Sequence, residues 1–335
     1  MAINESLAQL SNNCMYSAIA VYAGGMVAFA AEWAFGARVV SRAADSSVSR
    51  TRSVLGSTGI GATAVVVPPR IQSWSKTQFT ADKPGRIAVA LTLLAFGLHL
   101  AAVLCRGLSA QRVPWGNMYE FSTAAALAVS GAFLVLLTRQ PVRWLGVFVV
   151  PVVLLTLGLA VTVLYTESAQ LVPALNSYWL VIHVLAAVIS SGAFTLGAVA
   201  SLLYLLVARY RKYPPEGGSN TRRFAALLGR LPSAEVLDRT AYRAHVFVFP
   251  LWTFAVIAGA IWAERAWGRY WGWDPKEIWA FITWVVYAAY LHARATAGWK
   301  GTPAAMIALV GFGCFLFNYF GVNLWITGLH SYAGV

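Results

Sequence analysis

The sequence contains few charged residues. Of its 335 residues, 11% are charged and 59% are hydrophobic, a balance far from that of soluble globular proteins. The composition therefore predicts a chain that lies in a lipid bilayer. Cysteine is also scarce, because only Cys14, Cys105 and Cys314 are present and no two are close in sequence. This spacing excludes a CxxC redox pair, a CxxCH attachment sequence and a cysteine zinc site within the chain.

Acidic residues number only 12 against 25 Lys and Arg, which gives a formal net charge of +13. The basic residues lie between apolar runs and not on one face of a domain, so we expect no binding of nucleic acid. A helix needs about 20 apolar residues to cross the hydrocarbon core. Eight stretches approach or exceed that length: 15–35, 86–105, 119–137, 144–164, 177–208, 245–263, 275–293 and 303–325. The predicted fold is an all-α, polytopic membrane helix bundle with about eight transmembrane helices.

The basic residues also predict the orientation of the bundle. Alternate connections, those after the first, third, fifth and seventh spans, hold 20 of the 25 Lys and Arg. Because basic connections are retained in the cytoplasm, both termini should be extracytoplasmic. We expect residues 1–85 to comprise the first span and a flexible cytoplasmic linker from Arg38 onward, and residues 86–335 to form the functional transmembrane domain.

One external connection is unusually aromatic. Six of the fourteen tryptophans fall in residues 262–284. Four aromatic residues occur within seven positions: Trp267, Tyr270, Trp271 and Trp273. An interfacial aromatic belt accounts for one or two tryptophans at each helix end. The excess, interleaved with Gly and Arg in the connection between the sixth and seventh spans, indicates a platform on which a flat ligand stacks.

The end of this segment has the signature of a helix start. Asp274 suits the N-cap, Pro275 the first helical position, and Glu277 completes a capping box. Asp274 therefore has a structural explanation of its own. The positive end of the helix also lies beside the platform. Three cations stand near it, Arg265, Arg269 and Lys276, although such residues also flank spans for topology alone. A flat, apolar, dianionic ligand fits these features, and haem has a large π face and two propionates.

These residues carry a family resemblance. The pattern WG..W.WD..E at residues 267–277 resembles the WWD motif of haem-handling cytochrome c biogenesis proteins. The longer match over Trp262–Arg294 and Gly328–Tyr332 most closely resembles the CcsA (ResC) family of System II, as found in actinobacteria. The similarity is weaker in Pro114–Glu120 and Ser177–His183. The chemistry of the Pro114–Glu120 turn does not follow from the sequence.

The five histidines can be sorted by depth in the membrane. His183 lies about 10 Å below the outer end of its helix, and His330 follows the last span. Both are therefore expected near the outer face, where two neutral imidazoles can ligate one haem iron. His292 lies about 27 Å from Asp274, near the cytoplasmic end of its helix, so it cannot share that haem.

The resemblance implies a role for each of these histidines. His183 and His330 match the external ligands of a transiently bound haem b. His292 matches an internal ligand, whose partner ligand comes from a CcsB (ResB)-type membrane protein. The predicted catalytic residues are Trp267, Trp271, Trp273, Asp274 and Glu277. The predicted haem contacts are His183, His330, His292, Trp267, Tyr270, Trp271, Trp273, Arg265 and Arg269, with the three histidines as metal ligands.

The resulting hypothesis is haem delivery and covalent haem attachment to apocytochrome c on the outer face of the bacterial cytoplasmic membrane. The chain would act with the CcsB-type partner as a subunit of a holocytochrome c synthase. Its other partners would be an apocytochrome that offers CxxCH and a thioredoxin-like reductant that keeps those thiols reduced. Haem would supply the reactive chemistry, while the protein supplies binding and orientation.

Two alternatives belong to other classes. A membrane electron-transfer subunit would hold haem b permanently, and its internal histidine pair would be His245 with His292. A solute transporter would use the aromatic segment as a gate, but the spans show no paired broken helices. The roles of His99 and His245 do not follow from the sequence.

Overall fold

The computed structural model describes residues 3–55, 83–140, 142–170, 177–212, 228–229 and 231–330, and its regular structure in these ranges is entirely helical. The elements are α1 (Glu5–Leu55), α2 (Lys83–Ala110), α3 (Met118–Arg139), η2 (Arg143–Leu145), α4 (Gly146–Thr162), α5 (Tyr178–Lys212), α7 (Ala234–Trp267), α8 (Pro275–Thr296), α9 (Thr302–Leu316), the π-turn η4 (Phe317–Gly321) and α10 (Val322–Trp325). The predicted all-α fold is confirmed.

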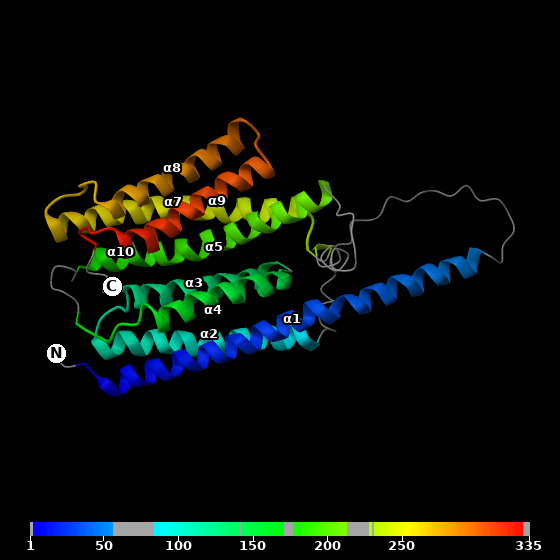
Figure 1. The fold of residues 1–335 in the computed structure, drawn as a ribbon, viewed down its shortest axis with the longest axis horizontal. Helices are drawn as coiled ribbons and strands as arrows, with labels where there is room; N and C mark the ends of the chain where they lie inside the picture. The colour runs from blue at the N-terminus through cyan, green and yellow to red at the C-terminus, as the bar shows by residue number, and fades with distance from the viewer. Residues whose placement is uncertain are drawn as a thin grey trace.

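The helices form two groups that run along one long axis (Figure 1). In the first group α1 packs along α2, and α3 packs on α4. In the second group α5 packs along α7, and α8 packs on α9. Helix α3 also contacts α5, so it joins the two groups into one bundle.

Within the described residues, seven helical segments are long and apolar enough to cross a membrane. They are Glu5–Ala34 and the segments of α2, α3, η2 with α4, α5, α7, and α9 through α10. Helix α8 falls outside this set and carries polar residues near both ends. Large apolar side chains such as Leu93, Leu155 and Val310 are exposed, as lipid contact requires. The chain is therefore a multi-pass membrane protein with seven or eight spans, in agreement with the eight predicted stretches.

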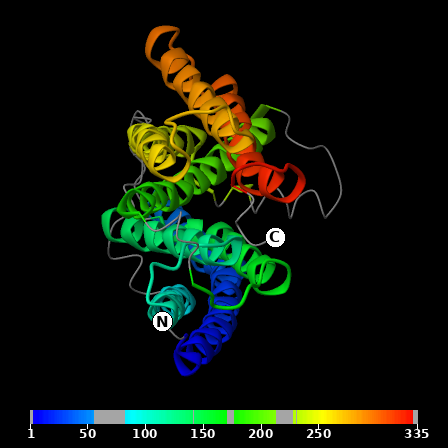
Figure 2. The same ribbon diagram turned by 90° about the vertical axis from the view of Figure 1, so that its left-hand side faces the viewer.

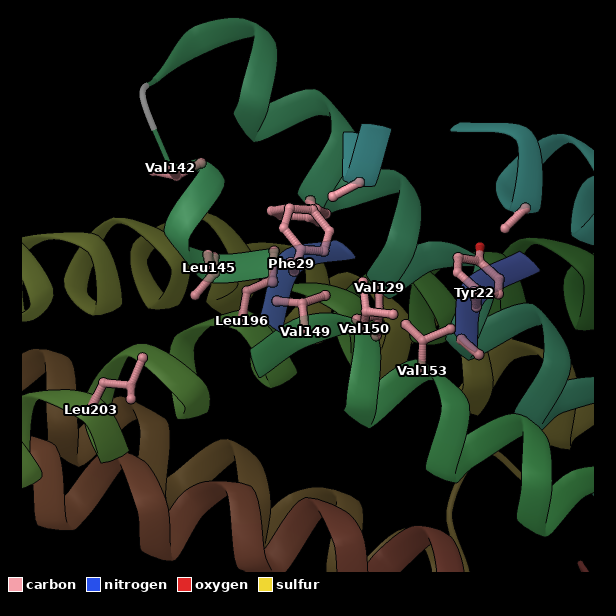
Figure 3. Packing of buried hydrophobic residues seen from close by; sticks show 14 of the residues in the cluster. Tyr22, Phe29, Val129, Val142, Leu145, Val149, Val150, Val153, Leu196 and Leu203 are labelled. Carbon is pink, nitrogen blue, oxygen red and sulfur yellow. The ribbon is translucent and has the colours of Figure 1, made fainter. Parts of the chain in front are cut away.

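The largest apolar core among the described residues lies between α1, α2, α3, α4 and α5 and extends to the start of α7. Leu145, Val149, Val153 and Leu157 recur every four residues and are almost completely buried. Because positions four apart share one face of a helix, this stripe turns towards the other helices of the core. Phe29 of α1 packs in the same cluster, as Figure 3 shows. This core fixes the helices that carry one wall of the site.

Several helices extend beyond the predicted spans; α1, for example, begins at Glu5 and not at residue 15. Helix α1 continues to Leu55, so residues 38–55, expected as flexible linker, are helical. Residues 56–82 of that linker lie outside the described residues. Helix α7 begins at Ala234, eleven residues before the predicted span, because polar turns extend it beyond the apolar run. The division of the chain after residue 85 stays a prediction, although α1 packs along α2.

Candidate functional site

At one end of the bundle, on the left of Figure 1 and facing the viewer in Figure 2, residues 268–274 join α7 to α8. An aromatic cavity lies at this end. Elements α3, α5, α7, α8 and the α9–α10 region all contribute to its wall. Its aromatic lining is Trp115, Phe121, Trp252, Trp262, Trp267, Tyr270, Trp271, Phe315 and Tyr319. The space between the lining atoms is about 1220 Å³, part of it open to solvent. Such a cavity suits a large, flat, apolar ligand with a few polar groups.

His183 enters this cavity from α5. Its Nδ1 lies 2.7 Å from the carbonyl oxygen of Ala255 on α7. A carbonyl oxygen only accepts hydrogen bonds, so Nδ1 carries the proton and Nε2 carries the lone pair. Gly259 makes room for the ring, because a Cβ atom there would lie 2.7 Å from its Cε1 and Nδ1. The helix pair α5–α7 thus sets both the tautomer and the position of this imidazole.

His330 lines the same cavity from the segment after α10. Its Nδ1 donates to Asp274 Oδ2 at 2.8 Å, and the N–H of Leu329 donates to Asp274 Oδ1 at 2.7 Å. Burial alone would raise the pKa of Asp274, but hydrogen bonds from His330 and Leu329 lower that pKa to about 2. Burial also lowers the pKa of His330, against the attraction of Asp274. The imidazole is therefore neutral, with its lone pair on Nε2, which is the form that ligates metals.

The two imidazoles flank the indole of Trp262, which is itself buried. The His183 ring is nearly parallel to this indole, at 8° and 6.2 Å between centroids. The His330 ring lies 6.0 Å from the same indole and 5.0 Å from that of Trp267, edge to face. The structure therefore brings the two predicted external ligands to one cavity at one end of the bundle.

The start of α8 has the predicted capping box. Asp274 accepts from the N–H of Lys276, and Glu277 accepts from the N–H of Asp274 at 3.0 Å. Glu277 also accepts from the N–H of Gly272 at 2.8 Å, so it holds the preceding turn. Asp274 thus serves two purposes, because the carboxylate that caps α8 also orients His330.

The two predicted arginine contacts do not line the cavity. The guanidinium of Arg265 lies 5.1 Å above the ring of Tyr178 and donates to its hydroxyl at 3.3 Å. Arg269 turns towards Gly272, where a Cβ would overlap its guanidinium, and pairs with Glu277 at 3.7 Å. Their role as haem contacts stays a prediction without geometric support. Lys276, in contrast, lines the cavity.

The aromatic residues of the segment divide into two sets. Trp267, Tyr270 and Trp271 line the cavity. Trp273 does not line it. This residue is 64% exposed, and its indole lies edge-on to that of Trp271 at 5.8 Å. Its backbone φ is +58°, a conformation that is unfavourable for a bulky residue. The turn into α8 therefore directs Trp273 away from the cavity.

His292 and His245 do not converge on a shared site. His245 is fully buried in α7, and its ring centroid lies 5.0 Å from those of Tyr287 and Tyr290 on α8. His292 is exposed and follows Tyr290 by two positions, about 200° around the helix. The internal pair required by the electron-transfer alternative is therefore not favoured. His99 is also fully buried, edge-on to Tyr22 at 6.0 Å.

Part of the cavity wall comes from the turn before α3. Trp115, Gly116, Asn117 and Met118 all line the cavity. This turn is held by Glu120, which is fully buried. Its carboxylate pairs with Arg106 at 3.0 Å and Arg112 at 2.7 Å and accepts from Gly116 N–H at 2.8 Å. Asn117 caps α3 by accepting from the N–H of Glu120.

The sequence analysis did not predict that the turn before α3 lines the cavity, nor that Trp252, Trp262 and Asn318 do. The weak resemblance over Pro114–Glu120 was the available signal for the turn. No local pattern signals Trp252 or Asn318, because their position in the wall depends on helix packing.

The fold and the cavity define a multi-pass helical membrane protein. Among the described residues, two histidines line one cavity at one end of the bundle, and no such pair is found at the other end. A family model described as "Cytochrome C assembly protein" matches residues 115–330, which include the entire cavity wall. The chain therefore belongs to the cytochrome c assembly protein family.

Its relatives include proteins named cytochrome c biogenesis protein CcsA. The chain is 36% identical over 307 residues to that of Synechococcus elongatus, covering 80% of this chain and 94% of that one. It is 37% identical over 287 residues to that of Microcystis aeruginosa, covering 74% and 87%. It is 38% identical over 241 residues to that of Chlamydomonas reinhardtii, covering 70% and 65%. The expected resemblance to the CcsA family is confirmed, and the chain functions in cytochrome c maturation.

One solved structure shares the fold. The structure named cytochrome c heme lyase CcmF matches with a TM-score of 0.55 and 18% sequence identity. The match covers 99% of this chain and 51% of that one, so this chain spans about half the length of that structure. The likeness establishes a common helical membrane architecture.

Proposed function

We propose that the aromatic cavity binds haem b between His183 and His330 and presents it for covalent attachment to apocytochrome c. The observation that carries this proposal is the pair of neutral imidazoles in one aromatic cavity. In each, Nδ1 is held by an acceptor, so the lone pair lies on Nε2. The names of the CcsA relatives and of the heme lyase with the same fold agree with this assignment.

The residues present fit such a substrate. Gly259 leaves a space beside His183 that a Cβ atom would fill, and the lining is mostly indole and other apolar surface. The buried Asn318 side chain lines the cavity with an oxygen for which the described part of the chain offers no hydrogen-bond donor. A macrocycle with a π face and two carboxylates complements these features.

Haem contributes the reacting iron and vinyl groups, and the protein holds and orients it. An apocytochrome would add each S–H of its CxxCH across one vinyl group, forming a thioether bond. Its histidine would then replace one of the two imidazoles on the iron. Trp262 and Trp267 pack against the imidazoles, and Asp274 fixes the orientation of His330. The protein thereby supplies positioning and exclusion of water more than acid or base groups.

We further propose that the cavity opens to the extracytoplasmic face of the bacterial cytoplasmic membrane. The distribution of Lys and Arg among the connections supports this orientation. Haem would enter at the opposite end, near the exposed His292, with a second ligand from a CcsB-type partner. Residues 86–335 would form the haem-handling domain, and a thioredoxin-like reductant would keep the apocytochrome thiols reduced. In this arrangement the chain is one subunit of a holocytochrome c synthase.

Replacement of either cavity histidine tests the proposal. His183→Gly and His330→Gly should each abolish holocytochrome formation and the absorbance of six-coordinate, low-spin haem. Free imidazole should restore both, because it can enter the space left by the ring, and this rescue excludes misfolding as the cause. Full yield of holocytochrome in either variant without imidazole would show that the ligand assignment is wrong.

A further inference from the structure

One side of the cavity, between α8 and η4, is polar. The proposed ligation of iron by His183 and His330 does not involve this side. Of the three cations near the start of α8, Lys276 is the one on the cavity wall, together with Asn318 and Tyr319. Arg265 and Arg269 are turned towards Tyr178 and Glu277. A lysine whose only role was to set the membrane orientation would extend its ammonium group into water, whereas Lys276 faces an aromatic cavity.

A hydrogen bond fixes the position of the Lys276 ammonium. Its Nζ donates to the carbonyl oxygen of Asn318 at 2.8 Å and lies 5.8 Å from the centre of the Tyr319 ring. Asn318 and Tyr319 belong to the π-turn Phe317–Gly321 between α9 and α10. π-Turns within helices occur frequently at functional sites. An ammonium group has three N–H donors, so the bond to Asn318 leaves others that can meet a ligand.

The side chain of Asn318 gives an independent indication of a ligand. Only 5% of this residue is exposed, and it lines the cavity. Its Oδ1 has no hydrogen-bond partner among the residues that the structure describes. Leaving a buried amide unsatisfied is costly. Because the oxygen and nitrogen of an amide exchange places by a flip, Asn318 can also direct its NH₂ group at an acceptor.

We propose that Lys276 and Asn318 form a subsite that binds a propionate carboxylate of the porphyrin held in this cavity. This inference rests on the proposed haem-binding function. A carboxylate within an apolar cavity requires an opposite charge and hydrogen-bond donors, and this side of the cavity supplies both. The vinyl groups lie on the porphyrin edge opposite the propionates, so the subsite orients the reactive edge away from α8 and η4. It therefore acts as a positioning device for thioether formation.

Binding of two porphyrins by the purified full chain tests the subsite. The probes are haem and haem dimethyl ester, whose carboxylates are both esterified. The wild-type chain should prefer haem by about tenfold or more, the factor expected of one charge-assisted hydrogen bond. Lys276→Met should bring the ratio of the two dissociation constants close to one, and Asn318→Ala should lower it in part. Lys276→Arg should keep much of the preference, because it keeps the charge.

Lys300→Met is the matched control. It also removes one lysine charge, but from an exposed position in the connection between α8 and α9, so the ratio should equal that of the wild type. The low-spin absorbance of bound ester in Lys276→Met reports an intact cavity. A wild-type ratio in both Lys276→Met and Asn318→Ala overturns the subsite alone. Absence of low-spin binding of either porphyrin to the wild-type chain overturns the haem-binding function itself.

Discussion

Replacing Gly259 with alanine is a sensitive test of His183 as a ligand. A Cβ atom at this position would lie 2.7 Å from Cε1 and Nδ1 of His183, whereas ordinary contacts begin at 3.4 Å. The ring must therefore move away from α7 by about 0.7 Å. Ala255 lies one turn earlier on the same helix, so the movement lengthens its 2.7 Å hydrogen bond. The new distance of about 3.4 Å lies beyond the usual range for N–H···O bonds.

Loss of that hydrogen bond costs about 1 kcal/mol, which is roughly fivefold in affinity. The displaced Nε2 also meets the iron at a poorer angle. We therefore expect Gly259→Ala to release haem about five to ten times more readily, measured by absorbance as haem transfers to an excess of a haem-scavenging apoprotein.

The matched control for this experiment is Gly313→Ala. Gly313 is also a helical glycine, on α9, and a Cβ there would meet nothing within 4 Å. Its haem release should match that of the wild type. Unchanged release and unchanged low-spin absorbance in Gly259→Ala would refute the assignment of His183 as a ligand positioned by α7.

Three further predictions follow from the contacts of the site. Glu120→Ala removes the carboxylate partner of the buried Arg106 and the partly buried Arg112, and it should lower the free energy of unfolding by about 3–5 kcal/mol. Glu235→Ala breaks an exposed ion pair and should change the free energy of unfolding by less than about 1 kcal/mol. Equal losses of stability in the two variants, measured by denaturation in detergent, would contradict this difference. Trp267→Ala should reduce haem retention more than Trp273→Ala, since only the first indole lines the cavity, and the reverse order in a haem titration would be inconsistent with the geometry. Asp274→Ala removes the N-cap of α8 and the acceptor for the neighbouring histidine. It should lower the free energy of unfolding by about 1–3 kcal/mol and weaken haem binding, and wild-type values of both would count against the dual role of this carboxylate.

Local sequence patterns determined the helical architecture of this protein. The apolar runs predicted every long helix of the described residues, because a segment in lipid must satisfy its backbone hydrogen bonds internally. The capping box of α8 was also predictable, since Asp274, Pro275 and Glu277 interact within one turn. Helical rise was sufficient to assign His183 and His330 to one end of the bundle and His292 to the other.

Tertiary packing decided which side chains of those segments form the cavity. The sequence presents Trp273 and Trp267 as equivalent, yet the turn into α8 directs the first outward and the second into the cavity. It likewise presents three cations as equivalent, yet only Lys276 among them lines the cavity. The protonated nitrogen of each ligand histidine depends on Ala255 and Asp274, which lie 72 and 56 residues away in the chain. These outcomes depend on contacts between distant segments, because helix rotation and side-chain direction are set by what packs against each helix.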